Sequence, residues 1–145
     1  MRILPTRRTA RIEMNTDIVR GIYDAFANGN VPAVLNSFDP KIEWREPEGL
    51  RYADGNPYIG PQAIVEGVFQ RVLADIRDFR VVPSRIIDAG DTVVVEGRFR
   101  GTMNATGTSI DAQFVHVWEL RDGKAIHMRI YTDTEQWSRA GGVNT

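Results

Sequence analysis

The chain has 145 residues, 42% of them hydrophobic, and a formal net charge of −1 with acidic and basic residues mixed along its length. This size fits one domain that buries about two thirds of its unfolded surface; the balanced charge argues against a nucleic-acid-binding protein, and the absence of cysteine excludes disulfides and thiolate chemistry. No apolar run approaches the ~20 residues of a membrane-spanning helix, so we expect a soluble, cytoplasmic protein.

The amino-terminal segment differs from the rest of the chain. Residues 1–13 contain four arginines, show no helical apolar period and lack the apolar core of a signal peptide. We therefore expect residues 1–13 to be a disordered basic extension. The domain itself should span residues 14–139, and residues 140–145, which include Gly141 and Gly142, should form a flexible tail.

Three helices are predicted in the first half of the chain. The first should start at a cap residue, Asn15 or Thr16, and the second has Pro32 in its first turn. The third starts at Pro61 and is the most regular, because its apolar residues recur with helical spacing in two rows. These rows are Ile64, Val68, Val72 and Ile76, and Val65, Phe69 and Leu73.

A short strand lies between the second and third helices. In the alternating stretch 41–46, Ile42, Trp44 and Glu46 share one face, which should point inward. An inward carboxyl group in an apolar pocket would have a raised pKa and would suit a general base. Alternatively, Glu46 turns to solvent or pairs with Arg45 or Arg51.

The rest of the chain has the period-two pattern of a sheet. Strands are predicted at 79–88, 92–102 and 109–120, and a hairpin adds a last strand after Asp122-Gly123. Helices followed by an antiparallel meander give an α+β domain whose sheet curls around the long helix and leaves a pocket. The loop 48–60 contains Leu50, Tyr52, Tyr58 and Ile59 and should form a lid or rim of this pocket.

The direction of the hairpin side chains depends on the register. A two-residue turn at Asp122-Gly123 predicts that Gln113, Val115, Val117, Met128 and Ile130 face the pocket. The opposite face should then be the interface of a homodimer. Its residues would be Arg98, Phe114, His116, Trp118, Arg129 and Tyr131. A slip of one residue would reverse these assignments and make His116 with Asp133 the leading acid–base pair.

Several motifs together resemble the SnoaL-like branch of the nuclear transport factor 2-like superfamily, which also contains the ketosteroid isomerases. The similarity runs from about Asn15 to Trp137 and rests on short stretches of sequence. They are Asn28-Gly29-Asn30, Phe38-Asp39-Pro40, Trp44-Arg45-Glu46-Pro47, Tyr58-Ile59-Gly60-Pro61, Val94-Val95-Glu96-Gly97-Arg98 and the hairpin from His116 to Asp133. The resemblance implies a cone of three helices and a curved sheet, usually dimeric, with a pocket for a small hydrophobic molecule.

The resemblance also indicates which residues of this sequence occupy the known catalytic positions of the superfamily. The general base of ketosteroid isomerases, which precedes a proline at the end of the first strand, matches Glu46. The oxyanion-hole positions of those isomerases fall on Ile22 and Val115, and Tyr23 is one residue away from the tyrosine position. The charged residues of epoxide hydrolases fall on Gly97, Phe99 and Ile130, and the catalytic aspartate of the cyclases also falls on Ile130. Neither the isomerase set nor the hydrolase set is therefore retained.

Two main functional hypotheses follow. The first is an isomerase, cyclase or lyase in which Glu46 takes a proton next to a carbonyl group of an apolar polycyclic or aromatic substrate. Gln113 or a tyrosine of the 48–60 loop would donate a hydrogen bond, and no cofactor or metal is expected. The expected substrate-binding residues are Tyr23, Phe26, Trp44, Tyr58, Phe69, Phe99, Gln113, Val115, Met128 and Ile130. The second hypothesis is a non-catalytic binder of a hydrophobic ligand, and the third is an epoxide hydrolase-like or purely structural dimer module.

Overall fold

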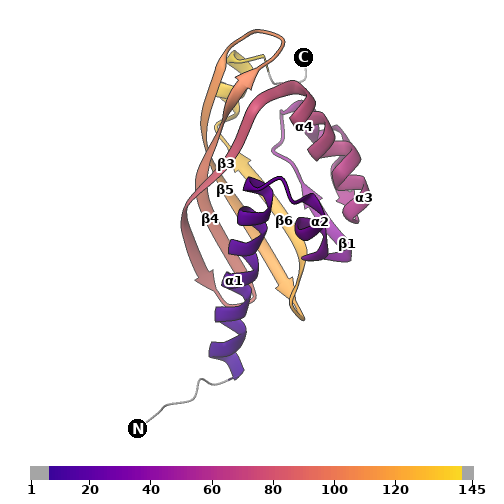
Figure 1. Ribbon diagram of the computed structural model, residues 1–145, viewed down its shortest axis with the longest axis vertical. Helices are drawn as coiled ribbons and strands as arrows, with labels where there is room; N and C mark the ends of the chain where they lie inside the picture. Colours follow the sequence, from indigo (N-terminus) through magenta and orange to yellow (C-terminus); the bar gives the residue numbers. More distant parts are fainter. Residues whose placement is uncertain (1–6, 142–145) are drawn as a thin grey trace.

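The computed structural model describes residues 7–141, with side chains described from Met14 onward (Figure 1). The elements in chain order are α1 (Arg7–Ala27), α2 (Val31–Asn36), β1 (Phe38–Arg45), the 3-10 turn η1 (Arg51–Gly55), β2 (Tyr58–Ile59), α3 (Pro61–Ile64), the π-helical segment η2 (Val65–Phe69), α4 (Gln70–Asp75), β3 (Ile76–Ala89), β4 (Thr92–Met103), β5 (Ser109–Arg121), β6 (Lys124–Thr132) and α5 (Thr134–Arg139).

The strands form one six-stranded sheet in the order β2-β1-β6-β5-β4-β3. Only the β1–β6 pair is parallel; the other neighbours are antiparallel. The sheet is curved and open, and the helices pack on one of its faces (Figure 1). Residues of α1, α2, η2 and α4 enclose a cavity against this face. This arrangement confirms the predicted α+β architecture. No helix within the described residues is long and apolar enough to cross a membrane.

The first helix begins earlier than predicted. α1 starts at Arg7, so the expected start at Asn15 or Thr16 is wrong. The Asn15 side chain is buried and its Nδ2 donates to the carbonyl oxygen of Gly90, 3.1 Å away, so it ties α1 to the β3–β4 turn instead of capping the helix. The division into residues 1–13, 14–139 and 140–145 stays a prediction, and residues 1–6 and 142–145 lie outside the described part of the chain.

The helical run from Pro61 to Asp75 is interrupted by the π-helical segment η2. Its first predicted row is buried, whereas the second is split, because Phe69 is buried and Leu73 is 50% exposed. A π-helical turn changes the phase of the residues that follow it, which explains why one continuous helical pattern fits both rows imperfectly. Ile76, assigned to the helix from its spacing, is the first residue of β3.

The hairpin of β5 and β6 differs from the predicted register by one residue. Arg121 pairs with Lys124 as expected, and Leu120 pairs with Ala125, but Glu119 pairs with His127. Ile126 is therefore an extra residue on β6, a β-bulge that shifts every later pair. Trp118 consequently pairs with Met128, and His116 pairs with Ile130.

The bulge leaves the β6 assignments right and reverses those of β5. Met128 and Ile130 are buried on the inner face as predicted. Phe114, His116 and Trp118 are also buried there, so placing them on an outer dimer face is wrong. Gln113, Val115 and Val117 lie on the outer face with Arg98, Arg129 and Tyr131. A homodimer through this outer face remains a prediction.

Candidate functional site

An apolar cavity lies between the helices and the inner face of the sheet. The empty space inside it is about 750 Å³, including the part that opens to solvent. Several expected ligand-binding residues do line it, namely Tyr23, Phe26, Trp44, Phe69, Phe99, Met128 and Ile130. Gln113 and Val115 do not, because the bulge in β6 places them on the other face. The cavity wall is almost entirely apolar, so its few polar atoms carry any specific chemistry.

Glu46 supplies a carboxyl group to this wall. It directly follows β1, on the same face as Ile42 and Trp44, and is only 7% exposed. Its Oε2 accepts a hydrogen bond of 2.7 Å from Nε1 of Trp44. Burial raises the pKa of Glu46 to about 7, and the Trp44 hydrogen bond and the positive charge of Arg71 oppose this rise without cancelling it. The carboxyl group therefore changes charge close to neutral pH.

The alternative positions considered for Glu46 are both wrong. The carboxyl group is not in solvent, and its two candidate partners bind elsewhere. Arg45 pairs with Glu43 at 3.2 Å, and Arg51 pairs with Asp75 at 3.1 Å. The Glu46 backbone is held by Asn56, whose Oδ1 accepts from the Glu46 N–H and whose Nδ2 donates to the Glu46 carbonyl oxygen, both at 2.8 Å. These two hydrogen bonds hold the Glu46 backbone in place at the end of β1.

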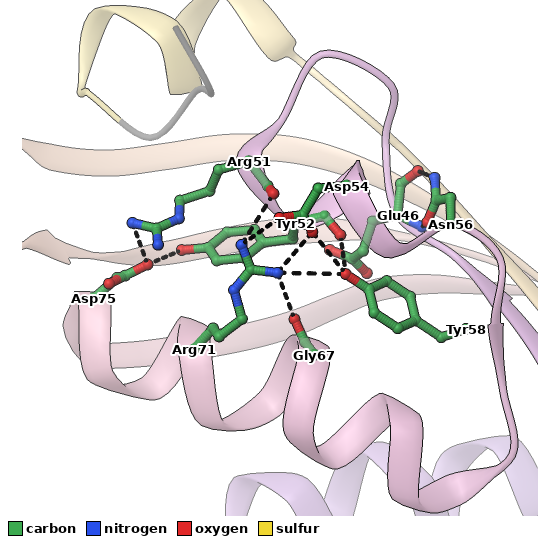
Figure 2. A network of polar contacts seen from close by, with 9 residues as sticks. All are labelled: Glu46, Arg51, Tyr52, Asp54, Asn56, Tyr58, Gly67, Arg71 and Asp75. Carbon is green, nitrogen blue, oxygen red and sulfur yellow. Dashed lines mark hydrogen bonds and ion pairs between the residues drawn. The ribbon is translucent and has the colours of Figure 1, made fainter.

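The 48–60 loop covers one side of the cavity, to which it contributes Leu50 and Tyr52. Figure 2 shows how Arg71, on α4, fastens this loop to the helix. Its guanidinium group binds both carboxylate oxygens of Asp54, at 2.8 and 3.1 Å, and the carbonyl oxygens of Arg51 and Gly67, each at 3.1 Å. These contacts support the prediction that the loop forms part of the pocket rim.

The tyrosines of the loop are already engaged in the fold. The Tyr52 hydroxyl donates to Asp75 at 2.9 Å, and the guanidinium carbons of Arg51 and Arg71 lie 5.7 and 5.4 Å from the centre of its ring. The Tyr58 hydroxyl donates to the Tyr52 carbonyl oxygen. Tyr58 is buried but does not line the cavity, because its ring packs against Gly55 and Gly67. Tyr58 therefore lies outside the cavity wall, and its role in ligand binding stays an untested prediction.

A second polar group lies in the cavity wall, on α1 and β5. The Tyr23 hydroxyl is 2.6 Å from Nδ1 of His116 and accepts a hydrogen bond of 3.0 Å from Nε1 of Trp118. All three side chains are buried and line the cavity. Burial lowers the pKa of His116 to about 3 and raises the pKa of Tyr23, so both groups are neutral at physiological pH.

The predicted pairing of His116 with Asp133 is absent. Asp133 caps α5, since its Oδ1 accepts from the backbone N–H of Gln136 at 3.2 Å. The Nδ1 atom of His116 is hydrogen-bonded to the Tyr23 hydroxyl, and its Nε2 has no hydrogen-bond partner within the described residues. The one-residue slip thus brings His116 into the cavity but does not give it a carboxylate partner.

Glu46 and His116 occupy the same level of the sheet. Arg45 pairs with Arg129 on β6, which brings the next residue, Glu46, level with Ile130, and Ile130 pairs with His116 on β5. The two polar side chains thus flank Ile130 on the inner face. Two strand spacings of about 4.8 Å place their backbones roughly 10 Å apart.

Counting from the hairpin turn alone missed the inward position of His116. The even positions of β5 contain a signal that would have found it. From Ile110 to Leu120 they are apolar except for His116, whereas the odd positions include Asp111, Gln113 and Glu119. Alternation along a whole strand defines its buried face even where a bulge changes the register.

The open curved sheet, the helices packed on one face and the apolar cavity between them define the class of nuclear transport factor 2-like folds. The sequence profile of the SnoaL-like domain matches residues 19–128, and the chain belongs to this family. This confirms the resemblance and the fold expected from the sequence. A comparison with curated proteins gave no match.

Solved structures agree with this assignment. A nuclear transport factor 2-like protein from Burkholderia thailandensis is 32% identical, with a TM-score of 0.83 over 87% of this chain and 95% of its own. One of unknown function from Burkholderia pseudomallei is 30% identical, with a TM-score of 0.80 over 88% and 96%. The protein TerC, co-crystallised with polyporic acid, is 30% identical, with a TM-score of 0.78 over 88% and 97%.

Proposed function

We propose that this protein is an enzyme of the isomerase, cyclase or lyase type. It would transfer a proton at a carbon next to a carbonyl group in an apolar, polycyclic or aromatic compound, with Glu46 as the general base. The reaction as proposed needs only a carboxylate and a hydrogen-bond donor, so no cofactor is invoked.

The buried position of the Glu46 carboxyl group in an apolar cavity carries the proposal. A base that removes a proton and returns it works best when its pKa is close to the working pH. Burial brings the pKa of Glu46 to about 7, so a large share of molecules hold it ionised at neutral pH, and its conjugate acid can still give the proton back. No cationic side chain forms an ion pair with it within the described residues, so its charge is free to act on a ligand.

The cavity wall supports the proposed substrate class. Rings of Phe26, Trp44, Phe69 and Phe99 surround the space beside Glu46, and flat aromatic or fused-ring compounds pack well against such a wall. The co-crystallisation of TerC with polyporic acid is consistent with small-molecule binding in this part of the family. A carbonyl group makes the neighbouring C–H bonds acidic enough for a carboxylate to act on them.

The test uses 2-tetralone, an enolisable bicyclic ketone, in deuterated buffer near neutral pH. Nuclear magnetic resonance follows the exchange of its α-protons for deuterium above the rate in buffer alone. We expect the wild type to accelerate exchange and Glu46→Gln to lose at least about 100-fold of this rate. Fluorescence of the cavity tryptophans, Trp44, Trp118 and Trp137, measures binding, which should change little.

Glu43→Gln is the matched control. Glu43 lies on the same strand but faces outward, where it pairs with Arg45, so its loss should leave exchange unchanged. Equal exchange by Glu46→Gln and the wild type would remove Glu46 as the base. Tight binding of 2-tetralone without any accelerated exchange would instead favour the non-catalytic binder.

A further inference from the structure

The proposed reaction requires a hydrogen-bond donor for the substrate oxygen, and the donors expected from the sequence do not serve. Gln113 lies on the outer face of the sheet, and the Tyr52 and Tyr58 hydroxyls donate to other groups. Among buried side-chain nitrogen and oxygen atoms of the described residues, Nε2 of His116 is the one without a hydrogen-bond partner. An unpaired buried polar atom destabilises the fold, so its presence in a cavity wall points to a ligand that satisfies it.

The neighbours of His116 determine which of its nitrogens carries the proton. The indole Nε1–H of Trp118 can only donate, so the Tyr23 oxygen accepts from it. Tyr23 then has one proton left to donate, and Nδ1 of His116 lies 2.6 Å away. With Nδ1 as the acceptor, the proton of the neutral imidazole is on Nε2. The opposite tautomer would leave the Tyr23 proton without an acceptor among the described groups.

We propose that neutral His116 is the group that binds the substrate oxygen, through a hydrogen bond from Nε2–H, and that Tyr23 and Trp118 are positioning residues that hold its tautomer. This inference rests on the proposed function and deepens it. Ile130 lies between His116 and Glu46 on the inner face, so a ketone lying over Ile130 would present its oxygen to His116 and the neighbouring carbon to Glu46.

The electron balance of the step is simple. The Glu46 carboxylate takes the proton, the C–H bond breaks, and its electron pair forms a carbon–carbon double bond. The former carbonyl double bond becomes a lone pair on the oxygen, which is now an enolate stabilised by His116 Nε2–H. Glu46 then returns the proton to the same or another carbon, and nothing is oxidised or reduced. A neutral imidazole is a suitable donor for an enolate, because it donates a hydrogen bond to the oxygen and keeps its own proton.

The inference names a requirement for the ligand. A compound with an acceptor oxygen should bind better than the same ring system without one, because only the first satisfies Nε2–H. The matched pair is 2-tetralone and tetralin, which differ in the carbonyl group. We expect the wild type to prefer the ketone at least about tenfold and His116→Phe, which keeps an aromatic ring at this position, to lose the preference.

Exchange of 2-tetralone protons gives the second readout. His116→Phe should lower the exchange rate about 100- to 1000-fold, the usual effect of removing one oxyanion donor, and His116→Gln, which offers an N–H, should recover part of it. If His116→Phe keeps both the ketone preference and the exchange rate while Glu46→Gln loses exchange, His116 is not the donor and the general base survives. If the wild type shows no exchange, the ketone preference alone still decides whether Nε2–H binds the oxygen.

Nitrogen-15 magnetic resonance tests the tautomer without any ligand. The protein has two histidines, so His127→Gln leaves His116 as the single imidazole signal. We expect a neutral ring with the proton on Nε2 throughout the neutral pH range, and loss of this fixed tautomer in Tyr23→Phe. A proton on Nδ1 in the unmodified site would overturn the inference, whatever the activity of the variants. Retention of the Nε2–H tautomer in Tyr23→Phe would remove the positioning role of Tyr23.

Discussion

Two carboxylates in the same stretch of chain, Glu46 and Asp54, have opposite electrostatic surroundings. Asp54 lies at the surface, where hydrogen bonds from Arg71 hold its pKa below the usual range. Glu46 is buried in the cavity wall, where burial raises its pKa to about 7. Asp54, which fastens the 48–60 loop, thus has a cationic partner, whereas Glu46 in the cavity wall forms no ion pair within the described residues. Paired charges suit a structural role, whereas an unpaired buried carboxyl group is available for chemistry.

The largest expected effect is on the free energy of unfolding, which should rise when the carboxylate of Glu46 is replaced by an amide and fall when that of Asp54 is replaced. The folded-state pKa of Glu46, about 7, lies above its ordinary value of 4.5, so the folded protein binds a proton more tightly than the unfolded chain. The cost of the buried charge is complete above pH 7, decreases as the pH falls and vanishes below pH 4.5. Glu46→Gln should therefore raise the free energy of unfolding by about 3 kcal/mol at pH 8 and by little at pH 4.

Urea denaturation at several pH values measures this difference, and Asp54→Asn is its counterpart. That variant should lower the free energy of unfolding at neutral pH by at most about 1 kcal/mol, because the lost pair with Arg71 is half exposed. The depressed pKa of Asp54 means that this loss shrinks as the pH falls through the acid range. A gain from Glu46→Gln that does not depend on pH would mean that the carboxyl group is not desolvated.

The same contrast explains which parts of the site the sequence predicts. The inward position of Glu46 follows from the alternation of Ile42, Trp44 and Glu46, because the register shift between β1 and β6 lies before Glu43. The inward position of His116 was obscured because counting from the turn does not reveal the extra residue Ile126. A bulge depends on how two strands twist and pack, which local sequence specifies weakly.

The partners of the polar side chains were not predictable at all. Arg71 and Asp54 are far apart in sequence and on different elements, and nothing in their local pattern indicates that they meet. The contact of Tyr58 with two glycines has the same origin. These features depend on how the loop packs on the helix, so the architecture and the inward position of Glu46 were accessible from sequence, whereas the contacts of the loop were not.

The second prediction concerns the packing behind the loop. A Cβ atom on Gly67, in the π-helical segment, would lie 2.1 Å from Cε1 of the buried Tyr58 ring. Gly67→Ala should therefore displace that ring and lower the free energy of unfolding by about 2 kcal/mol, despite the better helix propensity of alanine. Thermal unfolding measures the loss, and near-ultraviolet circular dichroism reports the displaced tyrosine.

Gly21→Ala is the control for that substitution. Gly21 lies in α1, and nothing would lie within 4 Å of an added Cβ atom. Alanine there should stabilise the protein by about 0.5–1 kcal/mol, the ordinary difference between the two residues in a helix. If Gly67→Ala behaves like Gly21→Ala, Tyr58 is not confined between the loop and the helix, and the loop is less tightly fastened than Figure 2 shows.

The smallest expected effect joins the two regions through Arg71. Arg71→Met keeps the stem of the side chain but removes its bonds to Asp54, Arg51 and Gly67. The free energy of unfolding should therefore fall by about 1 kcal/mol, and the amides of the 48–60 loop should exchange faster with deuterated solvent.

The positive charge of Arg71 also lowers the pKa of Glu46, although burial dominates. Removing this charge should move the pKa of Glu46 further upward, and with it the pH midpoint of 2-tetralone exchange. Arg51→Met is the matched control, since Arg51 also lies over Tyr52 but its charge does not shift the pKa of Glu46. An identical midpoint in the wild type and Arg71→Met would show that the loop and the cavity are electrostatically independent, so that the raised pKa of Glu46 depends on burial alone.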